Sequence, residues 1–292
     1  MGRELVDIIL PVLLPSLLGW AWGRSGRRFD METASELVVT VSSPCLIFSR
    51  LVGMQVERWA LSQMALLTLI AVVALAVAGA VLLRLFRLPI PAFLGCVVFT
   101  NSGNMAVPLS LFAFGARGEA LAVVYFGTSF LVHSLLGAPL VSGEWSARPM
   151  LRSPIAWAAV ASVVVLATGV HLPVFVVRTT KLVGDIAVPL MLIMMGVSLS
   201  KLPVRSLRNA LPVSLLRIGL GTGLGFLLAE VLALQGTVRG VLVLQCAMPA
   251  AVLNYVFAER YRRAPEDVAG TVLVSTVLSF ATLPLLLPVL AR

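Results

Sequence analysis

Long apolar runs separated by short polar gaps dominate this chain. A helix that crosses a lipid bilayer needs about 20 mainly apolar residues. The pattern predicts about ten such helices, near residues 5–22, 34–54, 60–83, 89–114, 119–141, 153–172, 175–199, 207–234, 236–258 and 266–290. Because no gap is long enough to hold a soluble domain, we expect an all-α polytopic membrane protein.

Two of these runs, the fourth and the ninth, are interrupted by polar residues or proline. An unpaired backbone group is costly in hydrocarbon, so an interrupted helix persists only where protein or a water-filled cavity satisfies it. Interruptions at corresponding positions of two halves point to the binding site of a transporter. The candidate substrate-binding residues are therefore Asn101, Ser102, Gly103, Asn104, Gln245, Pro249 and Asn254.

The two interrupted runs belong to a repeated unit. Pro44 and Pro189 are separated by 145 residues, as are Gly95 and Gly240 at the heads of the interrupted runs. Because each copy holds five spans, an odd number, the two copies must be inserted with opposite topologies. The sequence thus predicts a five-helix repeat over 1–141, a cytoplasmic linker over 142–153 and an inverted five-helix repeat over 154–292.

Composition agrees with a membrane protein. Apolar residues fill 59% of the 292 positions, charged residues fill 12%, and the mean hydropathy is +1.02. Soluble domains are roughly half apolar and a quarter charged. The net charge of +9 does not indicate a nucleic-acid partner, because the basic residues lie in short gaps between apolar runs. In such gaps they face the anionic head groups of the lipid bilayer.

The basic residues also predict an orientation. Alternate gaps form one set with thirteen Arg and Lys residues and another, tails included, with eight. The richer set is expected on the cytoplasmic side. This places a multi-pass protein in the cell (inner) membrane with both termini outside.

The interruptions carry a specific electrostatic prediction. We expect Gly103 to permit unwinding of the first helix, and Pro249, which lacks an N–H, to break the second. If the interruptions cross near the midplane, the helices that start there direct positive N-terminal ends into one cavity. The amides of Asn101 and Asn104 would orient an anion bound there. The alternative is a pair of packing kinks joined by interhelical asparagine contacts.

Two charged residues lie inside predicted spans. Asp185 is about ten residues into its span, which corresponds to roughly 15 Å of depth. Charged groups at that depth are costly and usually functional, so one hypothesis gives Asp185 a role in proton or cation coupling. The alternative is a hydrogen-bonded Asp that supports the helix around Pro189. Arg217 is nearer a span end, and we expect its side chain to snorkel out of the membrane.

Other chemistry is not indicated by the sequence. His133 and His171 are far apart, and neither has a cluster of cysteines or carboxylates beside it. The sequence therefore predicts no metal site and no cofactor. An intramembrane enzyme would need a nucleophile–base pair or a metal set, so we expect the protein not to be an enzyme.

At the interruptions the chain resembles the auxin efflux carrier family, which includes plant PIN carriers and bacterial permeases described as malate or malonate transporters. Residues 101–109, Asn-Ser-Gly-Asn-Met-Ala-Val-Pro-Leu, are similar to the family's fourth span. Residues 247–261, Ala-Met-Pro-Ala-Ala-Val-Leu-Asn-Tyr-Val-Phe-Ala-Glu-Arg-Tyr, are similar to its ninth-span signature. The resemblance covers essentially the whole chain.

The resemblance implies ten helices in an inverted repeat. It also implies a scaffold of spans 1, 2, 6 and 7, a mobile transport unit of spans 3–5 and 8–10, an elevator-type motion and a homodimer. Two features depart from the plant carriers. Thr100 stands before Asn101, where those carriers have proline, and only 142–153 replaces their long hydrophilic loop. Auxin itself is therefore a poor candidate substrate.

The sequence thus predicts a secondary transporter of a small organic anion, such as a carboxylate, bound where the fourth and ninth helices cross. One alternative is a sodium-coupled symporter of the bile-acid type, in which side-chain oxygens of Asn101, Ser102, Asn104 and Gln245 would hold the ion. Another is a membrane assembly or sensor protein that transports nothing. The substrate, the direction of transport and any proton or sodium coupling stay open.

Overall fold

The computed structural model describes residues 2–53, 58–142, 152–170, 172–202 and 208–290. These residues form helices and no strand, in the order α1 (Gly2–Arg24), α2 (Met31–Leu37), η1 (Val38–Ser42), α3 (Ser43–Gly53), α4 (Arg58–Leu85), α5 (Ile90–Val98), η2 (Ser102–Ala106), α6 (Val107–Ser142), α8 (Pro154–Thr168), α9 (Val174–Gly184), α10 (Ala187–Lys201), α11 (Ala210–Val231), α12 (Gly236–Ala247), α13 (Leu253–Arg260) and α14 (Pro265–Leu290). The all-helical fold class is as predicted. Residues 143–151 of the predicted linker, and His171, lie outside the described residues.

Seven helical segments of the described chain are long and apolar enough to cross a membrane. The helices α8 and α12 are apolar but shorter. A multi-pass membrane protein follows, while the count of ten spans and the inverted repeat stay predictions. The helix α6 contains a kink at Gly115, whose φ of 65° and ψ of −162° are not helical. Two of the predicted spans therefore meet within α6.

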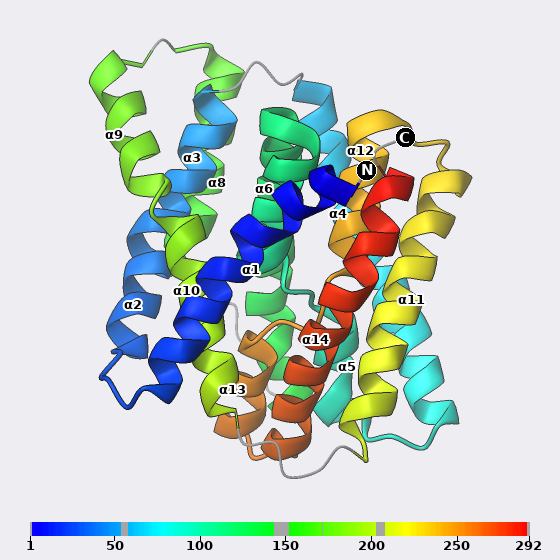
Figure 1. Ribbon diagram of the computed structural model, residues 1–292. Helices are drawn as coiled ribbons and strands as arrows, with labels where there is room; N and C mark the ends of the chain where they lie inside the picture. The colour runs from blue at the N-terminus through cyan, green and yellow to red at the C-terminus, as the bar shows by residue number, and fades with distance from the viewer. Residues whose placement is uncertain (1, 54–57, 143–151, 171, 203–207, 291–292) are drawn as a thin grey trace.

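The helices form two groups with α6 between them (Figure 1). The first group contains α2, α3, α8, α9 and α10, and α1 runs across it and packs along α10. The second contains α4, α5, α11, α12 and α14. The start of α1 and the end of α14 lie at the same end of the molecule (Figure 1), as an even number of membrane crossings requires.

Small residues bring α1 and α10 into contact. A Cβ added at Gly19 would collide with the backbone of Ile193, and one added at Gly196 would collide with the backbone of Ser16. Apolar burial between helices supplies little driving force in lipid, so association depends on such close van der Waals packing. The glycines therefore fix how α1 lies against α10.

The outer face of α4 carries the apolar surface expected next to lipid. Val73, Val77 and Val81 follow one another at four-residue spacing, so they lie on one helix face, and their exposed fractions are 61%, 62% and 61%. A soluble protein rarely leaves a continuous apolar patch in water. This face of α4 is therefore a lipid-facing surface.

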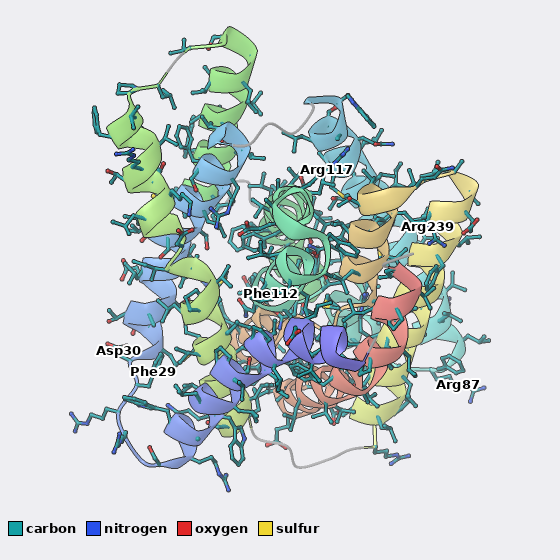
Figure 2. The ribbon with its side chains drawn as sticks, turned by 45° about the horizontal axis from the view of Figure 1, so that its top comes forward. Phe29, Asp30, Arg87, Phe112, Arg117 and Arg239 are labelled. Atoms are coloured by element: carbon teal, nitrogen blue, oxygen red, sulfur yellow. The ribbon has the colours of Figure 1, made fainter. Side chains whose placement is uncertain are left out.

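Basic residues gather at the two ends of the molecule. Arg84 lies in the last turn of α4, which begins at Arg58, so the two lie at opposite ends of one span. Figure 2 places Arg117 and Arg239 toward one end and Arg87 nearer the other. These five arginines therefore lie toward opposite ends of the molecule, as the alternation of basic gaps in the sequence predicts for them.

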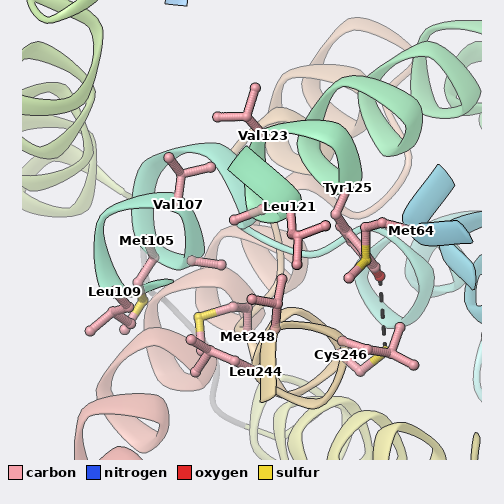
Figure 3. Packing of buried hydrophobic residues seen from close by; sticks show 14 of the residues in the cluster. Met64, Met105, Val107, Leu109, Leu121, Val123, Tyr125, Leu244, Cys246 and Met248 are labelled. Carbon is pink, nitrogen blue, oxygen red and sulfur yellow. Dashed lines mark hydrogen bonds between the residues drawn. The ribbon is translucent and has the colours of Figure 1, made fainter. Parts of the chain in front are cut away.

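The core joins α6 to α12 beside the interrupted helices (Figure 3). The Tyr125 hydroxyl of α6 lies 4.0 Å from the Cys246 sulfur of α12. Met105, Leu109, Leu121, Leu244 and Met248 pack in the same cluster, and all are fully buried. Interiors pack as densely as organic crystals, so this cluster holds the two segments in a fixed relation.

Candidate functional site: the crossing of two interrupted helices

The chain leaves helical geometry at two places that are distant in sequence. After α5 ends at Val98, Phe99 is extended, with φ −94° and ψ 113°, and helical geometry resumes at Ser102. After α12 ends at Ala247, Met248 is extended, with φ −67° and ψ 154°, and α13 begins at Leu253. We call residues 99–101 and 248–252 the two crossing segments.

The crossing segments satisfy each other's backbone groups. The Asn101 N–H donates to the Pro249 carbonyl at 2.8 Å, and the Ala251 N–H donates to the Phe99 carbonyl at 3.0 Å. Thr100 and Ala250 form an antiparallel bridge between these bonds. Irregular backbone survives within a membrane protein only when it is satisfied in this way.

The first interruption differs from its expected form. Gly103 is not the point of unwinding, because the extended residues precede it and Gly103 lies within the π-helical turn η2. A Cβ on Gly103 would lie 2.7 Å from the Phe126 ring, so the glycine is needed for this close approach. The bonds to Pro249 and Ala251 keep the backbone extended without help from a glycine.

A cavity of about 250 Å³ lies against the crossing. Asn101, Ser102, Gly103 and Asn104 line it from one crossing segment and η2, and 251–253 line it from the other segment and the start of α13. The remaining walls come from α2, η1, α3, α6, α8, α10 and Val256 of α13. No Asp, Glu, Lys or Arg is among the described residues that line it. The cavity is therefore a partly open pocket lined by uncharged side chains and by the first turns of two helices.

Asn101 and the adjacent Ser102 hold defined positions. Asn101 is 4% exposed, and its amide nitrogen lies 3.1 Å from the Met195 sulfur of α10. The Ser102 hydroxyl donates to the Thr100 carbonyl at 3.2 Å. Sulfur is a weak acceptor, so the Asn101 amide retains donor capacity for a ligand in the cavity.

The other predicted site residues support the crossing and do not line the cavity. The Gln245 amide donates to the Ala122 carbonyl at 3.3 Å. The Asn254 amide donates to the Phe99 carbonyl at 3.3 Å and to the Ala251 carbonyl at 3.0 Å. Pro249 accepts the bond from Asn101. A further contact comes from Ser275, whose hydroxyl accepts from the Ala250 N–H at 3.2 Å.

The lining residues that the sequence did not place at the site include His133 and Ser43. The His133 ring is 4% exposed and stacks on Phe99, with centroids 3.9 Å apart and planes 8° apart. Its Nε2, and the hydroxyl of the fully buried Ser43, have no hydrogen-bond partner among the described residues. Buried polar atoms are normally paired, so these two atoms beside the cavity are exceptions among the described residues.

The sequence predicted that the Arg217 side chain snorkels out of the membrane, and this prediction is wrong. The side chain is fully buried in the membrane-spanning part of α11. Its Nε donates to the Met248 carbonyl at 3.0 Å. Its two terminal nitrogens donate to the carbonyls of Val97 and Cys246. These carbonyls lie at the ends of α5 and α12. The guanidinium therefore finds hydrogen-bond acceptors inside the protein and does not need to reach the membrane surface.

Asp185 lies outside the cavity, at the junction of α9 and α10. Its carboxylate accepts from Lys181 at 2.7 Å and from Arg50 at 2.8 Å. Arg50 also pairs with Glu119 of α6 at 2.8 Å. The Asp185 side chain is 41% exposed. Asp185 is thus part of an ion-pair cluster that joins α3, α6 and α9.

Comparison with known proteins agrees with a transport role. The model of a family described as membrane transport protein matches residues 138–287, which is more than half of the chain. The chain belongs to this membrane transport protein family. It is the auxin efflux carrier family that the interrupted segments resembled.

Two similar proteins come from archaea. An uncharacterised transporter of Methanothermobacter thermautotrophicus is 29% identical over 295 residues, which covers 96% of each chain. An uncharacterised transporter of Methanocaldococcus jannaschii is 22% identical over 196 residues, which covers 63% of each chain. The protein is therefore a membrane transporter.

Proposed function

We propose that the protein is a secondary transporter of a small organic anion, which binds at the crossing and is moved by an elevator-type alternating-access motion. The observation that carries the proposal is the cavity beside the first turns of η2 and α13. The first N–H groups of a helix have no intrahelical partner, and the helix dipole makes that end positive. Two such ends line one pocket, which favours an anion there.

The cavity walls indicate what kind of anion fits. Met191, Met194, Met195, Phe126 and Phe130 give the cavity an apolar wall opposite the polar crossing. Its volume of about 250 Å³ exceeds the roughly 150 Å³ that accommodates a benzene molecule in an engineered protein cavity. A carboxylate with a short apolar body matches both walls, with the carboxylate at the helix ends.

Matched packing pairs support the inverted repeat. If the copies are equivalent, the contact of α1 with α10 corresponds to the contact of α8 with α3, and both are present. The contact of α4 with α5 likewise corresponds to that of α11 with α12. The crosswise contact of α4 with α12 corresponds to that of α11 with α5. An inverted repeat provides the two equivalent states that alternating access needs.

The position of the cavity supports an elevator motion. Its walls from α2, η1, α3 and α10 belong to the proposed scaffold, whereas those from η2, α6 and α13 belong to the proposed transport unit. A substrate at this boundary would be exposed to alternate sides as the transport unit slides. We further propose that the protein lies in the cell membrane as a homodimer. The gaps that hold more Arg and Lys residues would face the cytoplasm.

Ligand binding is the direct test. Purified protein is heated with each of a set of small carboxylates while its tryptophan fluorescence is followed. At least one carboxylate should raise the Tm of the wild-type protein by several degrees, because a ligand that binds only the folded state stabilises it. The same carboxylate should leave the Tm of Asn101→Ala unchanged. If no carboxylate shifts the wild-type Tm, or if both proteins shift equally, the proposed site is wrong.

A further inference from the structure

The most informative group outside the cavity is the guanidinium of Arg217. It donates to carbonyls at the end of α5, at the end of α12 and at Met248 of the second crossing segment. One side chain thereby contacts both interrupted helices on the side where they end. Among the described residues no carboxylate forms an ion pair with Arg217.

The partners of Arg217 form a site for a cation. The last carbonyls of a helix lack intrahelical partners and carry the negative end of the helix dipole. Two such ends meet here, and the site is fully closed to solvent. In transporters with discontinuous helices, unwound carbonyls and half-helix ends of this kind coordinate a coupling cation. In this protein the guanidinium donates to the corresponding carbonyls.

We propose that Arg217 is a fixed counter-charge that occupies the place of a coupling cation and makes transport independent of sodium. The inference rests on the proposed anion transport, and it decides between that function and the sodium-coupled alternative. A bound sodium ion leaves and returns in each cycle, whereas Arg217 stays. Because its charge balances the helix ends permanently, the helix starts on the cavity side remain free to attract the anion.

The test compares sodium with choline at equal ionic strength. Thermal unfolding is followed by tryptophan fluorescence for the wild-type protein, Arg217→Ala, Arg217→Lys and the control Arg239→Ala, which changes an arginine paired at the surface with Glu230. Wild type and the control should give the same Tm in both salts. Arg217→Ala should unfold at a lower temperature in choline chloride and recover by about 3 °C or more in sodium chloride, because the vacated carbonyls bind the ion.

Two results would overturn the inference. One is a wild-type Tm that rises in sodium chloride, which would mean that a sodium site coexists with Arg217. The other is a folded Arg217→Ala protein with the same Tm in both salts. Should Arg217→Ala fail to fold, Arg217→Lys decides. Its ammonium keeps the charge, so its Tm should be equal in both salts, and a rise in sodium chloride would contradict the proposal.

Uptake separates this inference from the proposed function. Wild-type proteoliposomes should take up the bound carboxylate at initial rates within about twofold of each other in sodium and in choline. A strict sodium requirement would refute the role of Arg217 while leaving the crossing site intact. If instead no carboxylate binds, the proposed function fails, and the salt response of Arg217→Ala still reports whether the carbonyls form a cation site.

Discussion

The two sides of the crossing differ in how the charge at the helix ends is balanced. On one side α5 and α12 end, and the Arg217 guanidinium bonds to their carbonyls. On the other side η2 and α13 begin beside a cavity, where His133 and Ser43 have unpartnered polar atoms. The protein itself neutralises the negative ends, while the positive ends face a space that a ligand can enter. This difference favours an anion over a cation as the substrate.

The largest expected effect comes from removing the Arg217 guanidinium from the side of the crossing where α5 and α12 end, which we call the closed side. Arg217→Met retains an apolar stem of similar length but leaves three buried carbonyls without their donor. We expect a loss of about 3 kcal/mol or more in the free energy of unfolding. Arg239→Met, which removes a surface pair with Glu230, should cost less than about 1 kcal/mol. Thermal or denaturant unfolding in detergent measures both, and equal losses would contradict the structural role of Arg217.

The second effect concerns the shape of the crossing. Pro249→Ala allows the second segment to extend the helix of α12, which would displace the carbonyl that accepts from Asn101. Initial uptake should fall to less than about a tenth of the wild-type rate, since small misplacements of a site are costly. Pro265→Ala is the matched control, because Pro265 stands at the start of α14, where proline is well tolerated. Normal uptake by the Pro249→Ala protein would show that the interruption is a packing kink.

A smaller effect is expected at His133. Phe retains the stacking on Phe99 but has no ring nitrogen. The substitution also removes the hydrogen bond between the ring and the Asn254 side chain. His133→Phe should therefore lower the Tm of the unliganded protein slightly and bind the carboxylate about tenfold more weakly, as the loss of one hydrogen bond to the ligand predicts. Isothermal titration measures the affinity directly. Unchanged affinity would mean that Nε2 does not contact the substrate.

The smallest effect is expected at Asp185, which is separate from both sides of the crossing. The coupling hypothesis predicts that Asp185→Asn removes the dependence of uptake on pH. The structure favours the ion-pair role, because Asp185 binds Lys181 and Arg50 and does not line the cavity. We expect the variant to keep the pH dependence of wild type and to lose less than about 1 kcal/mol of stability. Uptake across a pH gradient in proteoliposomes tests both expectations, and a lost dependence would restore the coupling role.

The sequence located the cavity side of the crossing better than the closed side. Asn101 to Asn104 are adjacent in the chain and polar within an apolar run, so a local pattern was enough to find them. Arg217 is 120 residues from Val97 and 31 residues from Met248. Only the fold brings these groups together. The prediction of snorkelling considered only how deep Arg217 lies in its span, so it could not include these buried carbonyl partners.

His133 and Gly103 show the same limit in other ways. A histidine in an apolar run gives no signal of a ligand site until its neighbours are known, and here its neighbour is the ring of Phe99. Gly103 lines the cavity, but the chain does not unwind at this residue. The flexibility of glycine suggested unwinding. In the structure Gly103 instead matters because it has no side chain, which lets the Phe126 ring approach closely.

The most direct test of the central claim is uptake of the carboxylate that binds best, measured in proteoliposomes with wild type and with Asn101→Ala. Asn101 lines the cavity and also bonds through its backbone to Pro249, and alanine keeps that backbone bond. The account predicts that both proteins fold with similar Tm values and that only wild type transports above the level of empty liposomes. Transport by the Asn101→Ala protein at the wild-type rate would contradict the claim that the anion binds at the crossing.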